Sequence, residues 1–127
     1  MSDTTTRGVR VEVKSVFVPE RSSPEEGHFF FAYRVRISNV GEETVHLLSR
    51  EWIVTDANGN VEQVNGPGVV GEQPILEPGE QFEYTSFCPL PTPIGSMHGS
   101  YQMVAAGGEE FDAEIAPFSL AVPTALN

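Results

Sequence analysis

The chain has 127 residues, the size of one domain, so we expect a single domain over residues 1–127, with a core from about 8 to 120 and short flexible tails. Eighteen acidic and seven basic residues give a formal net charge of −11, which argues against binding to nucleic acid or to anionic membranes. The single cysteine excludes an intrachain disulfide, and the lack of a long apolar stretch or an apolar leader favours a cytoplasmic protein.

Alternating apolar and polar residues predict strands through the first half of the chain. Residues 8–18 (GVRVEVKSVFV) form the first predicted strand, whose phase changes near Ser15 as a bulge would cause. Residues 28–39 (HFFFAYRVRISN) and 45–56 (VHLLSREWIVTD) form the next two. The pair Asn58-Gly59 predicts a hairpin turn into a short strand over residues 61–65. The expected inward side chains are Val9, Val11, Val13, Phe29, Phe31, Tyr33, Val35 and Ile37.

The same period of two continues in the second half, over residues 80–87 (EQFEYTSF), 99–106 (GSYQMVAA) and 110–120 (EFDAEIAPFSL). Pro117 predicts an irregularity or an edge position in the last of these strands. No stretch shows the apolar spacing of an amphipathic helix. The fold class we predict is therefore all-β: an immunoglobulin or fibronectin type III-like β-sandwich of seven to eight mostly antiparallel strands.

Gly66, Gly68 and Gly71 form a G-x-G-x-x-G pattern, which in dinucleotide-binding proteins lets the backbone approach a pyrophosphate. That fold requires a helix to begin at the motif, and Pro74 and Pro78 exclude one here. Two interpretations stay open. The loop Gly66, Gly68, Val69, Val70 and Gly71 either binds an anion through its backbone amides, or it is a structural turn that needs positive φ angles.

Four segments together resemble the bacterial ApaG family: LLSREWIVTD, GPGVVGEQPILEPGEQFEYTSFCPL, GSMHGSYQM and FDAEIAPFSL. The resemblance runs from about Val9 to Leu120. It implies a fibronectin type III-like sandwich, a genetic link to diadenosine tetraphosphate hydrolase, and an association with cobalt and magnesium resistance. The same domain occurs in some eukaryotic F-box proteins and in a polymerase-delta-interacting protein, which implies use as a protein-interaction module.

Arg50 and Trp52 are two residues apart and so share one face of a predicted strand, an arrangement that suits stacking of the guanidinium on the indole. We favour a core position for Trp52 and leave Arg50 as a candidate for an interaction surface. Ile94, in the extended stretch PTPIG, is a second such candidate, the alternative being a rigid crossover between strands.

Other chemistry finds little support in the sequence. His28, His46 and His98 lack the spacing of a metal site, and Cys88 lies beside apolar residues, which favours a buried structural thiol. We therefore predict no catalytic residue, no metal site and no cofactor.

The function predicted is that of a non-enzymatic domain that binds another protein, as a monomer or a weak homodimer. The alternative is a binder of pyrophosphate or a dinucleotide polyphosphate, with or without a divalent cation, through Gly66–Gly71.

Overall fold

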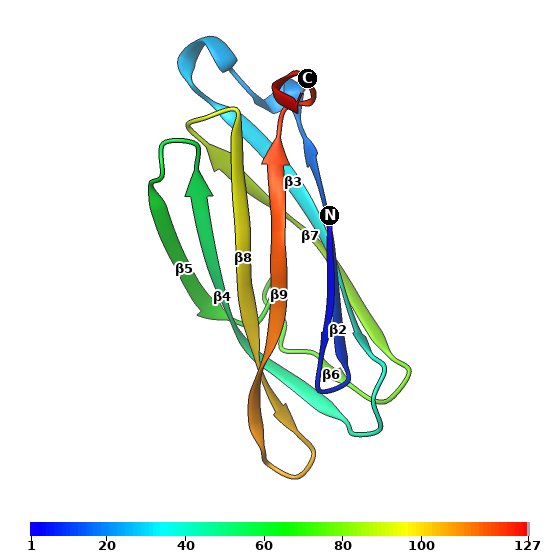
Figure 1. Ribbon diagram of the computed structural model, residues 1–127. Coiled ribbons are helices and arrows are strands. Elements are labelled where there is room, and N and C mark those ends of the chain that lie inside the picture. Colours follow the sequence, from blue (N-terminus) through cyan, green and yellow to red (C-terminus); the bar gives the residue numbers. More distant parts are fainter. Residues whose placement is uncertain (127) are drawn as a thin grey trace.

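A computed structural model describes residues 1–126 and shows two antiparallel β-sheets packed face to face (Figure 1). The first sheet has the strand order β1–β2–β3–β7, and the second has the order β5–β4–β8–β9, with β6 also paired to β4. The strands are β1 (Ser2–Thr6), β2 (Val9–Phe17), β3 (Phe29–Asn39), β4 (Val45–Asp56), β5 (Val61–Pro67), β6 (Ile75–Leu76), β7 (Gln81–Leu90), β8 (Ile94–Ala105) and β9 (Glu110–Ala121). The predicted all-β sandwich is confirmed.

Three short 3₁₀ helices complete the described part of the chain: η1 (Pro19–Arg21), η2 (Pro24–Glu26) and η3 (Pro123–Leu126). Among residues 1–126, no helix has the length and apolar character needed to cross a membrane.

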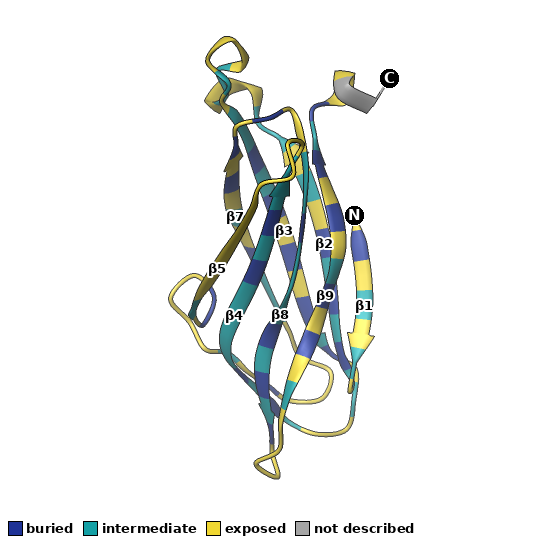
Figure 2. Cartoon of the chain, turned by 60° about the vertical axis from the view of Figure 1, so that its left-hand side comes forward, coloured by how far each residue is buried: buried dark blue, intermediate teal, exposed yellow. Residues whose placement is uncertain are grey.

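The core lies between the sheets and follows the alternation read from the sequence, as the banded burial of the strands in Figure 2 shows. Inward side chains alternate with outward polar ones because successive residues of a strand point to opposite faces. Each inward position expected in residues 9–37 is buried, except Phe29, which is half-buried and packs against the core. Tyr101, Met103, Ala113 and Ile115 are also buried between the sheets.

The described residues 1–126 form nine strands, two more than the seven segments predicted, and the prediction of an N-terminal tail was wrong. Ser2–Thr6 forms the edge strand β1, which pairs with β2 from Ser2 opposite Val13 to Thr6 opposite Val9. Asp3 makes an ion pair of 2.7 Å with Arg10, and the Thr6 hydroxyl accepts a hydrogen bond from the amide of Glu114. The strand could not be predicted from the polar sequence SDTTT, because backbone pairing and not an apolar face holds it in place. At the other end, η3 occupies most of the expected tail, and Asn127 lies outside the described residues.

The bulge expected near Ser15 is absent, because the register of β2 with β3 runs unbroken from Val9 to Phe17. The apparent change of phase arises because Val16 is apolar yet points outward, with 61% of its surface exposed. Register shifts occur instead in β4, between Leu47 and Ser49, and in the β8–β9 pair beside Met97. The second shift lies opposite Pro117, and it confirms the irregularity predicted there.

Candidate functional site

The glycine motif spans the end of β5 and a tight turn. The amide of Val69 donates to the carbonyl of Glu72 at 2.8 Å, and the amide of Glu72 donates back to Val69 at 2.9 Å. The two residues between them, Val70 and Gly71, have positive φ angles of 42° and 82°, as a two-residue hairpin turn of type I′ requires. Val69 is fully buried, whereas Val70 is 59% exposed, so the turn anchors one valine in the core and presents the other to solvent.

Gly68 occupies a position that only glycine fits. Its φ is +59°, and a Cβ atom there would lie 2.2 Å from the carbonyl oxygen of Glu72. Its amide donates to the carbonyl of Leu48 at 2.9 Å, which ties the turn to β4. Together with the bond from Val69 to Glu72, this bond engages two of the amides of the candidate loop, those of Gly68 and Val69.

Arg50 lies against the same loop from β4, where it is the direct partner of Gly66 across the β4–β5 pair. A Cβ on Gly66 would lie 2.9 Å from the guanidinium, so the missing side chain makes room for Arg50. One guanidinium nitrogen, Nη1, donates to the carbonyls of Pro67 at 3.0 Å and Gly68 at 2.8 Å. The loop thus directs carbonyl oxygens toward a cation, and the hydrogen bonds from Arg50 hold the loop against β4.

The candidate site residues therefore divide into two groups. Arg50, Gly66, Gly68, Val69, Val70 and Gly71 come together at one corner of the second sheet. Ile94 does not join them, because it begins β8 and Arg50 pairs with Tyr101, seven residues along that strand and roughly 20 Å away. Ile94 is 37% exposed, so it remains available as a surface residue, separate from the loop.

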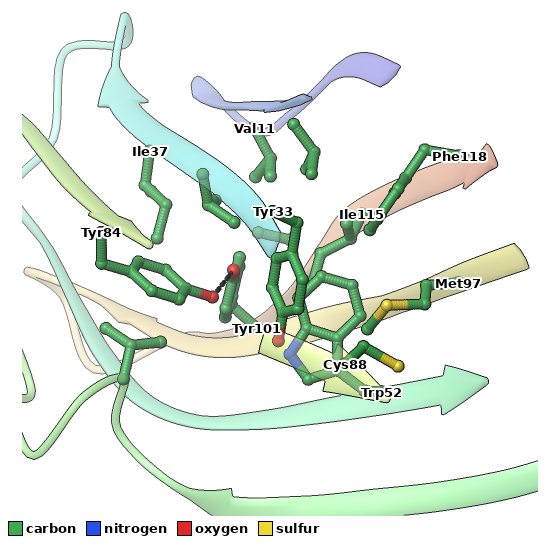
Figure 3. Close-up of a cluster of buried hydrophobic side chains, with 14 of the residues drawn as sticks. Val11, Tyr33, Ile37, Trp52, Tyr84, Cys88, Met97, Tyr101, Ile115 and Phe118 are labelled. Atoms are coloured by element: carbon green, nitrogen blue, oxygen red, sulfur yellow. Dashed lines mark hydrogen bonds between the residues drawn. The ribbon is translucent and has the colours of Figure 1, made fainter. Parts of the chain in front are cut away.

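Trp52 lies in the core as expected and is 3% exposed (Figure 3). Its indole meets the rings of Tyr33 at 5.3 Å, Phe118 at 5.9 Å and Tyr101 at 6.3 Å, in edge-to-face arrangements that aromatic pairs favour. The tryptophan joins the two sheets at the centre of the sandwich.

A buried pair of tyrosines was missed by the sequence reasoning. The hydroxyls of Tyr84 and Tyr101 hydrogen-bond to one another between the sheets (Figure 3). Burial raises the pKa of both phenols above the usual range. The available signal was that Tyr84 and Tyr101 both occupy inward positions, but their pairing depends on how the sheets face one another. Polar groups buried in this way satisfy each other.

Cys88 is the structural thiol expected from its neighbours. It is 7% exposed, and burial, with a smaller effect of the Glu62 carboxylate, raises the pKa of the thiol to about 11. Among the histidines, His46 hydrogen-bonds through Nε2 to the carbonyl of Gln73 at 3.1 Å. No cluster of three metal-ligating side chains occurs in the part of the chain that the structure describes.

The two sheets, the central tryptophan and the strand order define a small β-sandwich domain of the fibronectin type III-like class. A likeness to the C-terminal domain of wzt, with a TM-score of 0.52, 12% identity, and 95% of this chain and 77% of that chain covered, supports the fold alone.

The chain belongs to the ApaG family, because the ApaG domain model matches residues 19–105. It is 61% identical to the Protein ApaG of Anaeromyxobacter sp. (strain K) over 127 residues, which cover both chains completely. The crystal structure of the putative ApaA protein from Bordetella pertussis is similar at a TM-score of 0.89 and 51% identity, covering 91% of this chain and 94% of that one.

Proposed function

We propose that this chain is a non-enzymatic domain that binds another protein through its open strand edges. The observation that carries the proposal is the exposure of apolar side chains on the two edge strands β5 and β7. Val61 and Val64 of β5 are 65% and 40% exposed, and Phe87 of β7 is 50% exposed. Edge strands present unpaired backbone N–H and C=O groups, and a partner strand adds to them readily when the edge is long and apolar.

A cleft of about 270 Å³ lies between these edges and supports the proposal. Its floor consists of buried side chains that include Trp52 and Cys88, and its rim includes Arg50, Val64 and Phe87. A strand added at either edge points alternate side chains to one face, so one of them can enter this cleft while the backbone pairs.

The state of the polar groups in this region supports a binding role over catalysis. The raised pKa of Cys88, about 11, keeps its thiol protonated at neutral pH, whereas a nucleophilic cysteine needs a thiolate. The hydroxyls of Tyr84 and Tyr101 bond to one another, and burial keeps both protonated.

The test is photo-crosslinking in cells with a photoreactive amino acid at position 64 or 87. Position 40 is the matched control, because Val40 is 60% exposed but lies outside the strands. We expect positions 64 and 87 to capture the same protein and position 40 not to capture it. Binding of that purified partner should then weaken at least fivefold on V64K. Equal capture at all three positions, or capture at none, would refute the proposal.

Binding of pyrophosphate or a dinucleotide polyphosphate remains the second candidate, and the presence of Arg50 at the glycine loop favours it. Nη1 of Arg50 is engaged by the loop carbonyls, so an anion would have to use other donors of the guanidinium with the amides of Val70 and Gly71. An amide-resolved NMR titration with pyrophosphate and diadenosine tetraphosphate, each with and without Mg²⁺, tests this. Saturable shifts centred on Gly66, Gly68 and Gly71 would support it, and their absence would leave the loop a structural turn.

A further inference from the structure

The outer face of the first sheet carries two adjoining rows of unlike chemistry. We call it the β2–β3–β7 face and define it by the outward residues Arg10, Glu12, Lys14 and Val16 of β2, Phe30, Ala32, Arg34 and Arg36 of β3, and Glu83, Thr85 and Phe87 of β7. The register places Lys14 opposite Arg34, and it places Val16 opposite Ala32, which faces Phe87 on its other side. A cationic row therefore lies directly beside an apolar row.

This face is the basic part of an acidic protein. It holds Arg10, Lys14, Arg34 and Arg36, and the guanidinium of Arg21 lies over its Phe30 and Phe87 rings at 5.0 and 5.3 Å. Four of the seven basic residues of the chain therefore lie on this face, with two of the eighteen acidic ones, Glu12 and Glu83. The remainder of the chain holds three basic and sixteen acidic residues, so the charge of this face is opposite to that of the rest of the chain.

The cations of the face are not all neutralised. Glu83 pairs with both Arg34 and Arg36, and Arg10 pairs with Asp3 and Glu12. Among residues 1–126, Lys14 has no carboxylate within ion-pairing distance, and the Arg34 side chain is 65% exposed despite its one ion pair. Lys14 and Arg34 thus lie side by side, and their positive charge is not fully neutralised by neighbouring carboxylates.

The apolar row beside them is open to solvent. Val16 is 61% exposed and Phe87 is 50% exposed, and the Phe87 ring stacks on Phe30 with centroids 5.4 Å apart. A shallow hollow of about 260 Å³ lies where the two rows meet, lined by Lys14, Val16, Ala32, Arg34 and Thr85 among others. The hollow offers an apolar surface and two cations to a single bound group.

We propose that the β2–β3–β7 face binds an acidic, extended segment of a partner protein that carries an apolar anchor residue. The inference rests on the proposed function, because it names a surface and a chemistry for the protein partner. Charge complementarity selects an acidic segment, and the hollow beside the apolar row takes its anchor. The face from Arg36 to Phe30 covers seven residues of β3, roughly 20 Å, which about seven residues of extended chain would span.

The experiment is an amide-resolved NMR titration of the full chain with two synthetic probes. The first is a twelve-residue peptide in which glutamate alternates with valine and one central phenylalanine, and the second replaces each glutamate by lysine. We expect saturable shifts on β2, β3 and β7 with the acidic peptide only, and weaker binding at higher salt. Shifts elsewhere, shifts of equal size with both peptides, or none would overturn the proposal.

Matched variants separate the two rows. K14Q and Q63E each make the net charge more negative by one, but Gln63 lies on β5 of the other sheet. We expect K14Q to weaken acidic-peptide binding about two- to fivefold, because an exposed ion pair contributes only a modest free energy, and we expect Q63E to change the binding by less than twofold. V16T should weaken binding and V40T should not, because Val40 is equally exposed but lies outside the strands. Equal effects within either pair would overturn the proposal.

Inorganic tripolyphosphate is the third probe and tests the cationic row alone. We expect it to bind more weakly than the acidic peptide and to be insensitive to V16T. Binding as tight as the peptide's would mean that the face takes small anions, which would overturn the proposal. The crosslinking result is separate: a partner captured at positions 64 and 87 with no peptide effect of K14Q would leave the proposed function standing and remove this surface from it.

Discussion

Replacing Gly68 with alanine is the sharpest test of the loop geometry. The left-handed conformation at φ +59° costs an L-residue about 1–2 kcal/mol. The new Cβ would also lie 2.2 Å from the carbonyl oxygen of Glu72, so the turn must move by nearly 1 Å. That movement weakens the paired Val69–Glu72 hydrogen bonds, which contribute about 1 kcal/mol each. We expect G68A to lower the free energy of unfolding by about 3–4 kcal/mol.

Gly71 supplies the matched control. Its φ of +82° carries a similar conformational cost, but a Cβ there would meet nothing within 4 Å among the described residues. G71A should therefore cost only about 1–2 kcal/mol. Urea denaturation, followed by the fluorescence of the single tryptophan, Trp52, measures both, and the slope with urea should match that of the parent chain. Equal losses for G68A and G71A would show that the contact with Glu72 has no energetic effect.

Three further predictions concern Arg50, the tyrosine pair and Cys88. R50M removes the hydrogen bonds to the carbonyls of Pro67 and Gly68, so it should lower the free energy of unfolding by about 1–2 kcal/mol in urea denaturation. It should also speed hydrogen exchange at the Gly68 amide, and unchanged exchange would contradict this role of Arg50. Y84F and Y101F should each cost about 1–2 kcal/mol, because each leaves a buried hydroxyl without its partner, while the double variant should cost clearly less than the sum; simple additivity would argue against the pair. The pKa of Cys88 in the folded protein, about 11, exceeds its ordinary value of 9.0, so the contribution of the thiol to stability is present below pH 9 and lost as pH rises toward 11. C88A should therefore reduce the decrease in the free energy of unfolding between pH 9 and pH 11. An unchanged pH profile would refute the burial of the thiol.

The alternation of apolar residues predicted most of the fold, and its errors have physical causes. Strands with a buried face, such as Phe29–Asn39, can be predicted because apolar and polar residues alternate along them. The edge strand β1 cannot, because its five polar residues are held by backbone pairing, by the ion pair of Asp3 with Arg10 and by the hydrogen bond from the amide of Glu114 to Thr6. Val16 caused the opposite error, the prediction of a feature that is absent. Its side chain is apolar but points outward, so the local pattern indicated a bulge where the register of β2 with β3 is continuous.

The candidate site was less predictable, because its contacts are made between strands. The sequence shows that Gly66 and Arg50 are both present, but not that Arg50 lies directly opposite Gly66. That placement depends on the register of β4 with β5, which the hairpin turn at Asn58-Gly59 sets. The tyrosine pair has the same origin, since Tyr84 and Tyr101 belong to different sheets.

A glycine motif of this kind has two physical meanings, which differ in the backbone group that converges on its centre. In an anion cradle, several amides point inward and an anion completes them. Here the carbonyls of Pro67 and Gly68 converge on Arg50, while the amides of Gly68, Val69 and Glu72 bond to other carbonyls. Glycine serves both cases because each needs positive φ or a close approach, so its spacing cannot distinguish them. The group at the centre does distinguish them: here Nη1 of Arg50 donates to the loop carbonyls, so an anion would have to bind beside Arg50, through its other donors, and not at the centre of the loop.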